Sequence, residues 1–258
     1  MKVIILAGGL GTRISEESHL KPKPMIEIGE QPILWHIMKY FSTYKFNEFI
    51  ILAGYKQNKI KEYFANYFVY NSDVTFYMAN NSMEVHHKTA ENWKVTVLDT
   101  GLNTMTGGRV KRAKEYIGNE PFMLTYGDGV ADVDLNALQD FHNKHGKIAT
   151  ITTVSLAQQK GVLEKEENGL IKTFREKSID DAAMINGGYM LLNPDIFNYI
   201  EGDTTVFEQT TLNRLAEEEQ LMGFEHDGFW QCMDTQREKD KLERLWAEGK
   251  APWKRWND

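Results

Sequence analysis

A glycine-rich turn near the N-terminus has the residue types that allow a backbone to bind phosphate. Gly8, Gly9 and Gly11 directly follow an apolar run, VIILA at 3–7. Backbone N–H groups can approach phosphate oxygens there, because glycine has no Cβ and tolerates positive φ. A tight strand-to-helix turn without a ligand would show the same pattern. The segment lacks the G-K-[S/T] of a P-loop, and Ile14 stands where a dinucleotide fingerprint needs Gly or Ala.

Arg13 and Lys23 are the cations that we expect to work with this turn as catalytic residues. The planar fork of the Arg13 guanidinium can bind two phosphate oxygens. Lys23 can bring a single positive charge to a phosphate, and Pro22 and Pro24 stiffen the backbone that presents it. Without the glycine turn upstream, a solvated loop lysine would be the simpler interpretation. We interpret Lys21 as a supporting cation only.

Two carboxylates are candidates to hold a divalent cation against those phosphates. Asp128 lies in TYGDG at the C-terminal end of a predicted strand, where ligands of open α/β sheets usually bind. Asp234 lies in MDT, after an aromatic segment. Carboxylate and phosphate oxygens, with waters, make the octahedron that Mg²⁺ prefers. Alternatively, Asp128 forms a turn and Asp234 caps a helix that starts at Thr235.

Two further motifs are more ambiguous. TGGR at 106–109 precedes the amphipathic RVKRAKEYI, so it is typical of a helix start whose free N–H groups point outward. An ordinary cap at Thr106 and a surface arginine at Arg109 would look the same. His86 and His87 suggest a metal site, but neighbouring residues on a strand face opposite ways. We therefore do not expect these histidines to chelate one ion.

The hydrophobic pattern predicts the elements that position these residues. Short β-branched runs alternate with stretches whose apolar residues are three and four apart, which is typical of a mostly parallel sheet covered by helices. Asn168-Gly169 predicts a hairpin, and residues 71–96 have the weakest periodicity, as in an excursion from the sheet. The predicted strands are 3–7, 49–54, 122–127 and 148–154, and the predicted helices are 32–43, 57–68, 134–145 and 235–249.

Length and composition exclude several classes of protein. The 258 residues, of which 41% are hydrophobic, suit one large α/β domain. A net charge of −7 disfavours polymeric nucleic acid but permits free nucleotides. Cys232 is the only cysteine, so an intramolecular disulfide is excluded and a reducing compartment fits. VIILA is too short to span a membrane and no signal-peptide pattern follows it, so we expect a cytoplasmic protein without a membrane partner.

The motifs GGLGTR and KPKPM resemble those of the sugar-1-phosphate nucleotidylyltransferases, and the resemblance covers nearly the whole chain. The combination of HHK, TGGR and GFWQ with MDT is narrower and indicates the branch that uses CTP. The resemblance implies a Rossmann-like three-layer α/β/α fold with a mixed, mostly parallel sheet and a small antiparallel addition. It implies a single domain over 1–258, with a nucleotide-binding part of about 1–130 and a sugar-binding and C-terminal part of about 131–258.

The resemblance also implies the reaction and the residues that perform it. A sugar 1-phosphate, most closely α-D-glucose 1-phosphate, attacks the α-phosphorus of CTP with Mg²⁺ as cofactor, and pyrophosphate leaves. Family members assemble as trimers or hexamers. The nucleotide-binding set is Leu6, Ala7, Gly8, Gly9, Gly11, Thr12, Arg13, Lys23, Thr106, Gly108, Arg109 and Gly127. The sugar-phosphate set is Tyr126, Gly161, Glu176, Lys177, Asn186, Gly187 and Trp230, and the metal set is Asp128 and Asp234.

Two departures from the family pattern fall on the sugar side. Ser178 stands where the family continues EKP, and SLAQQKGVL at 155–163 replaces a PPGRFGAL-like run. Another phosphorylated acceptor is therefore an alternative. UTP or dTTP as donor is also an alternative, because base edges are often read by backbone groups that leave no residue signature. A nucleotide-binding sensor without catalysis is a third. It has no need for the full charge-neutralising set of Lys23, Asp128 and Asp234 together with Arg13, so their joint presence argues against it.

Overall fold

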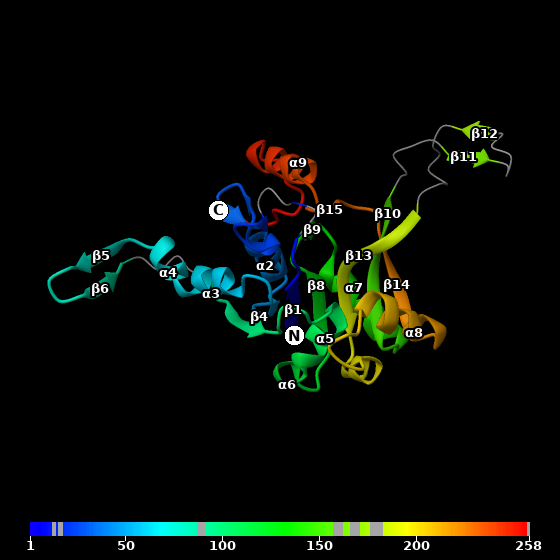
Figure 1. Cartoon of the computed structure of the whole chain (residues 1–258), viewed down its shortest axis with the longest axis horizontal. Coiled ribbons are helices and arrows are strands. Elements are labelled where there is room, and N and C mark those ends of the chain that lie inside the picture. Colours follow the sequence, from blue (N-terminus) through cyan, green and yellow to red (C-terminus); the bar gives the residue numbers. More distant parts are fainter. Residues whose placement is uncertain are drawn as a thin grey trace.

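A seven-stranded sheet forms the centre of the described structure (Figure 1). The computed structural model describes residues 1–11, 14, 18–86, 91–156, 162–165, 171–175 and 183–256. The strand order is β14-β10-β13-β8-β1-β4-β7, in which β13 alone runs antiparallel to its neighbours. The predicted mixed, mostly parallel sheet is thus confirmed. The strands are β1 Lys2–Ala7, β4 Glu48–Ala53, β7 Lys94–Asp99, β8 Phe122–Tyr126, β10 Ala149–Leu156, β13 Ala183–Leu192 and β14 Leu221–His226.

Helices cover both faces of the sheet, because successive side chains of each strand enter opposite cores. Val3 and Ile5 of β1 lie in the core beneath α2, α3, α7 and α9, whereas Ile4 and Leu6 lie in the core beneath α5, α6 and α8. These three layers confirm the predicted fold class. The helices are α2 Ile33–Thr43, α3 Gln57–Ala65, α4 Tyr67–Tyr70, α5 Thr106–Arg112, α6 Lys114–Ile117, α7 Leu135–His145, α8 Leu212–Glu217 and α9 Gln236–Ala247.

The predicted strands lie within one or two residues of β1, β4, β8 and β10, but one predicted helix is interrupted. Residues 57–68 form α3 and α4, with a break at Asn66. Asn66 has non-helical backbone angles, φ −101° and ψ 3°, and both its amide and its side chain donate to the carbonyl of Glu62, at 3.1 and 2.8 Å. Pro32 precedes α2 as its N-cap rather than starting it. The helix predicted at 235–249 is α9, which begins one residue after Thr235.

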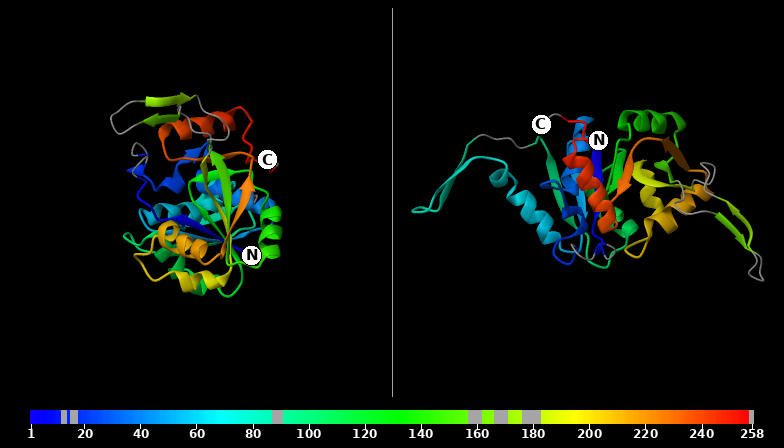
Figure 2. Two further views of the ribbon diagram at one scale, coloured as in Figure 1. Left: turned by 90° about the vertical axis from the view of Figure 1, so that its right-hand side faces the viewer. Right: turned by 90° about the horizontal axis from the view of Figure 1, so that it is seen from above.

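Two hairpins lie outside the central sheet. Strands β5 Val74–Tyr77 and β6 Ser82–Val85 pair with each other and extend away from the body of the molecule, as Figure 1 and the right-hand view of Figure 2 show. This arm is the predicted excursion, but the predicted range 71–96 extended too far, because residues 94–96 belong to β7 of the central sheet. Strands β11 Val162–Lys165 and β12 Ile171–Arg175 form the predicted antiparallel addition, although Asn168-Gly169 lies outside the described residues. Within the described part of the chain, every helix is too short or too polar to cross a membrane.

Candidate active site

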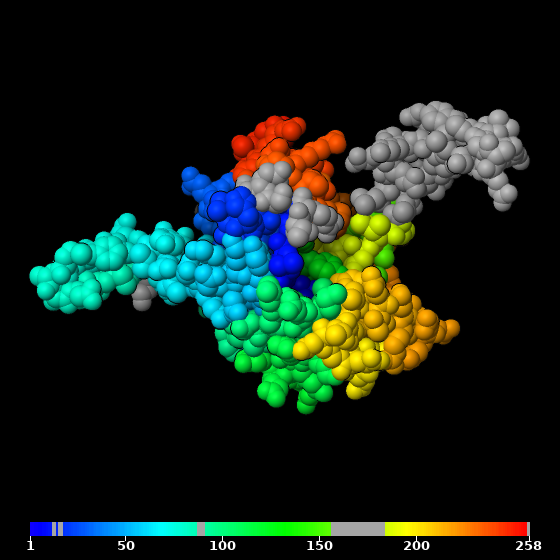
Figure 3. Space-filling view, in the orientation of Figure 1, coloured from blue at the N-terminus to red at the C-terminus, as the bar shows by residue number. Residues whose placement is uncertain are grey.

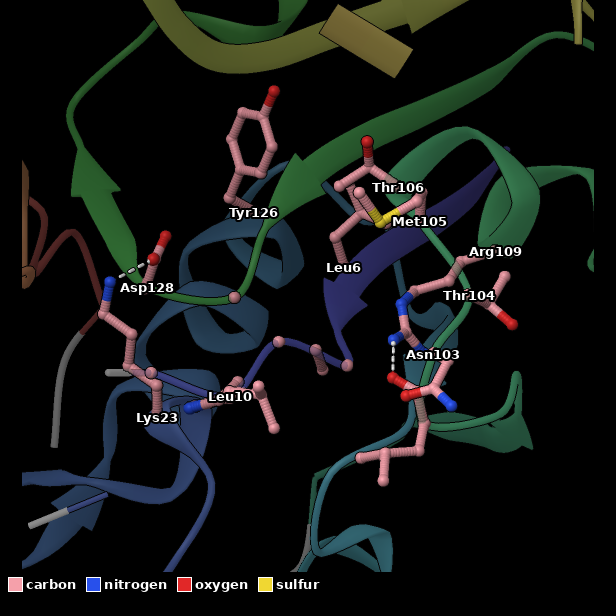
Figure 4. Close-up of a pocket in the computed structure, with 17 residues that line it drawn as sticks. Leu6, Leu10, Lys23, Asn103, Thr104, Met105, Thr106, Arg109, Tyr126 and Asp128 are labelled. Atoms are coloured by element: carbon pink, nitrogen blue, oxygen red, sulfur yellow. Dashed lines mark hydrogen bonds and ion pairs between the residues drawn. The ribbon is translucent and has the colours of Figure 1, made fainter. Parts of the chain in front are cut away.

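A cavity of about 570 Å³ opens at the carboxyl ends of β1 and β8 (Figure 4). The space-filling view shows a hollow where N-terminal residues, in blue, meet the middle of the chain, in green (Figure 3). β1 and β8 are adjacent and parallel, so the turns after them share one edge of the sheet. This volume is typical of small-molecule sites. Of the predicted nucleotide-binding residues, those that line it are Leu6, Ala7, Gly8, Gly9, Gly11, Lys23, Thr106, Arg109 and Gly127.

The surroundings and backbone conformation differ among the three glycines of the first turn. A Cβ on Gly8 would lie 2.2 Å from Nη1 of Arg109, so only glycine allows this guanidinium beneath the turn. Gly11 has a φ of +66°, which side chains rarely adopt. A Cβ on Gly9 would meet no atom within 4 Å. Packing therefore explains Gly8 and backbone conformation explains Gly11, whereas Gly9 faces open space.

Arg109 is a buried cation whose partners are uncharged. Its side chain donates to the hydroxyl of Thr100 at 2.6 Å, to the carbonyl of Gly101 at 2.7 Å and to the carbonyl of Leu102 at 3.1 Å. Burial lowers the pKa of Arg109 from its ordinary value, and the charge of Arg112 adds to this effect. Within the described residues, no carboxylate lies within ion-pair distance of Arg109. The surface alternative for this arginine is wrong, because its guanidinium fixes the segment 100–102 beside the cavity.

The two glycines of the TGGR motif allow close chain contact. A Cβ on Gly107 would lie 2.7 Å from the carbonyl oxygen of Thr205, and one on Gly108 would lie 2.5 Å from Cα of Asp203. Gly108 is not among the residues that line the cavity. The ordinary-cap alternative for Thr106 is also wrong, since Met105 occupies the N-cap and makes no side-chain cap bond.

Lys23 lies at the other end of the cavity between two carboxylates. It sits in the buried 3₁₀ turn Lys23–Met25, which follows Pro22. Its ammonium nitrogen is 2.5 Å from Oδ2 of Asp128 and also pairs with Oδ1 of Asp234. Burial acts to lower the pKa of Lys23, but the two carboxylates together outweigh it and the pKa is raised. The side chain is therefore a firmly protonated cation.

Strand pairing brings these two aspartates together from distant parts of the sequence. β9 Gly129–Ala131 pairs with β15 Trp230–Cys232, and the amide of Met233 donates to the carbonyl of Asp128 at 2.8 Å. Thr235 caps α9 in a capping box with Glu238. The alternative role of Asp234 as that cap is therefore wrong, and its carboxylate is left to face Lys23.

The carboxylates of Asp128 and Asp234 suit a divalent cation that is also bound by phosphate. Both contact the single ammonium nitrogen of Lys23, so one small cation can reach both. In the described ranges, no group of three or more His, Cys, Asp or Glu side chains is arranged to hold a metal by itself. The remaining ligands of a Mg²⁺ ion would have to be waters and substrate oxygens, which is its usual coordination in phosphoryl-transfer sites.

A smaller cavity of about 230 Å³ adjoins the first and shares Tyr126 and Asp128 with it. Its lining also includes Gly187 and Trp230, two of the predicted sugar-side residues. The indole of Trp230 donates to the carbonyl of Gly187 at 2.7 Å, and Asn186 donates to the hydroxyl of Tyr126 at 3.3 Å. The structure thus brings the predicted sugar residues beside the predicted nucleotide residues.

Lys21 lies outside both cavities, and several other residues singled out in the sequence lie outside the described residues. Lys21 pairs with Glu27 at 2.8 Å and lines neither cavity. The predictions that lie outside the described residues are Thr12, Arg13, His87, Gly161, Glu176, Lys177 and Ser178.

Sequence reasoning missed two parts of the site. The loop 102–105 lines the larger cavity, and Glu208 hydrogen-bonds to Thr106 and Tyr126. Neither belongs to a motif, and their positions follow only from contacts between distant segments.

Comparisons with known proteins agree with this geometry. Residues 2–238 match the family model described as nucleotidyl transferase. The chain is 57% identical over 257 residues to the glucose-1-phosphate cytidylyltransferase of Salmonella typhi, and the alignment covers 99% of this chain and 100% of that protein. It is 29% identical over 250 residues to the mannose-1-phosphate guanyltransferase of Saccharomyces cerevisiae, covering 94% of this chain and 63% of that protein.

Among solved structures, the chain resembles the UDP-glucose pyrophosphorylase of Acinetobacter baumannii. The TM-score is 0.69 at 16% identity, over 96% of this chain and 94% of that chain. At this identity the likeness shows a common fold.

Proposed function

We propose that this chain, which belongs to the nucleotidyl transferase family, transfers CMP from CTP to glucose 1-phosphate and releases pyrophosphate. The observation that carries the proposal is that two cavities share Tyr126 and Asp128, with Lys23 paired to Asp128 at their junction. The choice of base and sugar is supported by the identity of 57% to the Salmonella typhi cytidylyltransferase.

In the proposed reaction the nucleotide occupies the larger cavity and glucose 1-phosphate occupies the smaller one. A phosphate oxygen of the sugar forms a bond to the α-phosphorus, and the bond from that phosphorus to the β-phosphate oxygen breaks. The anionic nucleophile needs no base, so the protein contributes positioning and charge neutralisation. Lys23 supplies the positive charge where the cavities meet, beside the α-phosphoryl group.

Asp128 and Asp234 are proposed to bind Mg²⁺. The ion would neutralise triphosphate oxygens when bound. Because Lys23 contacts the same two carboxylates, the lysine and the metal draw on shared oxygens. Lys23 has a long and flexible stem, which suits it to exchange a carboxylate for a phosphate oxygen.

The nucleotide is proposed to lie over the first glycine turn. Gly9 leaves the space open, Gly11 provides the left-handed backbone, and Arg109 supports the turn from below. Thr12 and Arg13, in the same motif, complete the proposed phosphate contacts. Glu176 and Lys177 are proposed to complete the sugar-phosphate side together with Asn186.

We also infer that the chain assembles as a homo-oligomer, a trimer or hexamer. The arm β5–β6 carries large apolar side chains in contact with solvent, including Phe76 at 57% and Met78 at 87% exposure. Apolar groups gathered on a projecting segment are typical of protein interfaces. Light scattering should give the mass of an oligomer for the wild type and a smaller mass for Phe76→Ser with Met83→Ser. Tyr116→Ser, on an exposed aromatic of α6, is the control that should leave the mass unchanged.

The experiment that tests the function is a product assay with a panel of nucleotides. Purified protein with Mg²⁺ and glucose 1-phosphate is offered CTP, UTP, dTTP, GTP or ATP, and products are identified by mass. We expect CDP-glucose and an equal amount of pyrophosphate from CTP. Activity with dTTP alone would contradict the cytidylyl assignment, and activity only with another sugar phosphate would contradict the acceptor.

A further inference from the structure

Glu208 lines neither cavity, yet its carboxylate contacts Thr106, which lines the larger cavity, and Tyr126, which lines both. It lies in a π-helical turn, Phe207–Thr211, a conformation that is rare and frequent at functional sites. Oε1 accepts a hydrogen bond from the hydroxyl of Tyr126 at 2.6 Å, and Oε2 accepts one from the hydroxyl of Thr106 at 2.7 Å. In Figure 4 both hydroxyls point toward the top of the view, away from Lys23 and Asp128.

The charge of Glu208 is stabilised by hydroxyl groups. Among the described residues, no Lys, Arg or His lies within ion-pair distance of this carboxylate. A carboxylate only accepts hydrogen bonds, so both hydroxyls must donate to it. Such charge-assisted bonds are short and strong. Burial, followed by the charge of Glu208, raises the pKa of Tyr126, which keeps its phenol a donor.

On the sugar side, this contact fixes the Tyr126 ring and the residues behind it. A Cβ on Gly188 would lie 2.7 Å from Cδ2 of Tyr126, so the ring packs directly on that backbone. The phenol oxygen accepts from Asn186 Nδ2 at 3.3 Å, and Asn186 Oδ1 accepts from the amide of Gly188 at 2.9 Å. The donors therefore run in one direction, from Asn186 through Tyr126 to Glu208.

On the nucleotide side, the same turn holds the start of α5. The amide of Phe207 donates to the hydroxyl of Thr106 at 2.9 Å, and the amide of Gly107 donates to the carbonyl of Thr205 at 2.9 Å. α5 also carries Arg109, which supports the first glycine turn. The segment around Glu208 thus joins the two walls of the site.

We propose that Glu208 is a positioning residue that fixes Tyr126 relative to Thr106 and so keeps the sugar-phosphate cavity in line with the nucleotide cavity. The proposal rests on the proposed function, in which atoms from the two cavities must meet. In-line transfer is sensitive to misplacement of about 1 Å, so a contact outside the cavities can control the rate.

Glu208→Gln tests the proposal because it keeps the size of the side chain and leaves only one acceptor oxygen. We expect kcat/KM to fall by about 10- to 100-fold, with KM raised for both substrates. Tyr126→Phe should raise mainly the KM for glucose 1-phosphate, and Thr106→Val mainly the KM for CTP. Glu217→Gln, on an exposed acid of α8, is the matched control and should behave like the wild type.

Two readouts separate positioning from a purely structural role. If Glu208 acts through the Tyr126 hydroxyl, Glu208→Gln should cost much less in the Tyr126→Phe background than in the wild type. Without any ligand, the ¹⁹F resonance of Tyr126 in fluorotyrosine-labelled protein should shift in Glu208→Gln and stay in place in Glu217→Gln. If Glu208→Gln does not fold, Glu208→Asp replaces it in both readouts with the same expected results. The aspartate keeps the charge but is too short to bind both hydroxyls.

The outcomes distinguish this proposal from the proposed function. Wild-type kcat/KM in Glu208→Gln, or independent losses in the double variant, would overturn the positioning role. If the wild type makes no CDP-glucose, the proposed function fails. The position of the Tyr126 resonance then decides whether Glu208 fixes that ring.

Discussion

Two buried cations stand at opposite ends of the larger cavity, and they are neutralised in different ways. Lys23, 8% exposed, pairs with the carboxylates of Asp128 and Asp234, and its pKa is raised. Arg109, 5% exposed, is held by backbone carbonyls and the Thr100 hydroxyl, and its pKa is lowered.

The difference indicates what each cation does. The carboxylates that hold Lys23 can accept another cation, so the lysine can be released toward phosphate. The carbonyls that accept hydrogen bonds from Arg109 belong to the segment 100–102, so the guanidinium cannot leave them without disrupting the conformation of that segment. We therefore propose a catalytic role for Lys23 and a structural role for Arg109.

Lys23→Ala should produce the largest effect on turnover. We expect kcat to fall by about 10³-fold, because a positive charge is lost where negative charge develops. Without the lysine, two carboxylates remain unpaired, so Mg²⁺ should raise the melting temperature of this variant more than that of the wild type. Lys21→Ala, on a half-buried lysine nearby that pairs with Glu27 and lines neither cavity, is the control and should keep normal turnover. Near-normal turnover in Lys23→Ala would remove the lysine from the chemistry.

Arg109→Met should mainly reduce stability. The variant loses several charge-assisted hydrogen bonds and leaves buried carbonyls without donors, at a cost of about 3 kcal/mol in the free energy of unfolding. Urea denaturation measures this loss. Arg112→Met, one turn of helix away and exposed, should unfold almost like the wild type. Equal losses in the two variants would show that the buried arginine is no more structural than the surface one.

Asp128→Asn should have the smallest effect of the three variants, and the effect should be on the Mg²⁺ dependence of turnover. One of the two charged oxygen ligands is replaced, so the Mg²⁺ concentration for half-maximal turnover should rise by about tenfold. A metal titration of activity checks this, with Asp140→Asn, on an exposed acid of α7, as control. An unchanged titration would refute the ligand assignment for Asp128.

The sequence predicted the parts of the fold and site that depend on local pattern. Apolar runs located β1, β4, β8 and β10. Lys23, Asp128 and the residues of the first glycine turn were predicted from their own motifs and from the family resemblance. That they meet at one edge of the sheet follows from the parallel pairing of β1 with β8, which the structure shows.

Residues whose roles depend on contacts between distant segments could not be predicted in this way. Glu208 matters only because the turn after residue 203 packs against α5 and β8, and no local pattern encodes that contact. The TGGR segment was interpreted as a helix start that helps to bind the nucleotide, although Gly107 and Gly108 are also required by the backbone of residues 203–205. The burial of Arg109 was likewise missed, because an amphipathic helix start gives no sign of what its arginine contacts.

The cavity around Lys23 is proposed to transfer a nucleotidyl group to a sugar phosphate. The most direct test uses CTP labelled with ³²P at the α-phosphate, together with glucose 1-phosphate and Mg²⁺. We expect the label to appear in CDP-glucose and the released pyrophosphate to be unlabelled. Label that stays in CTP, or appears only in free CMP, would contradict it.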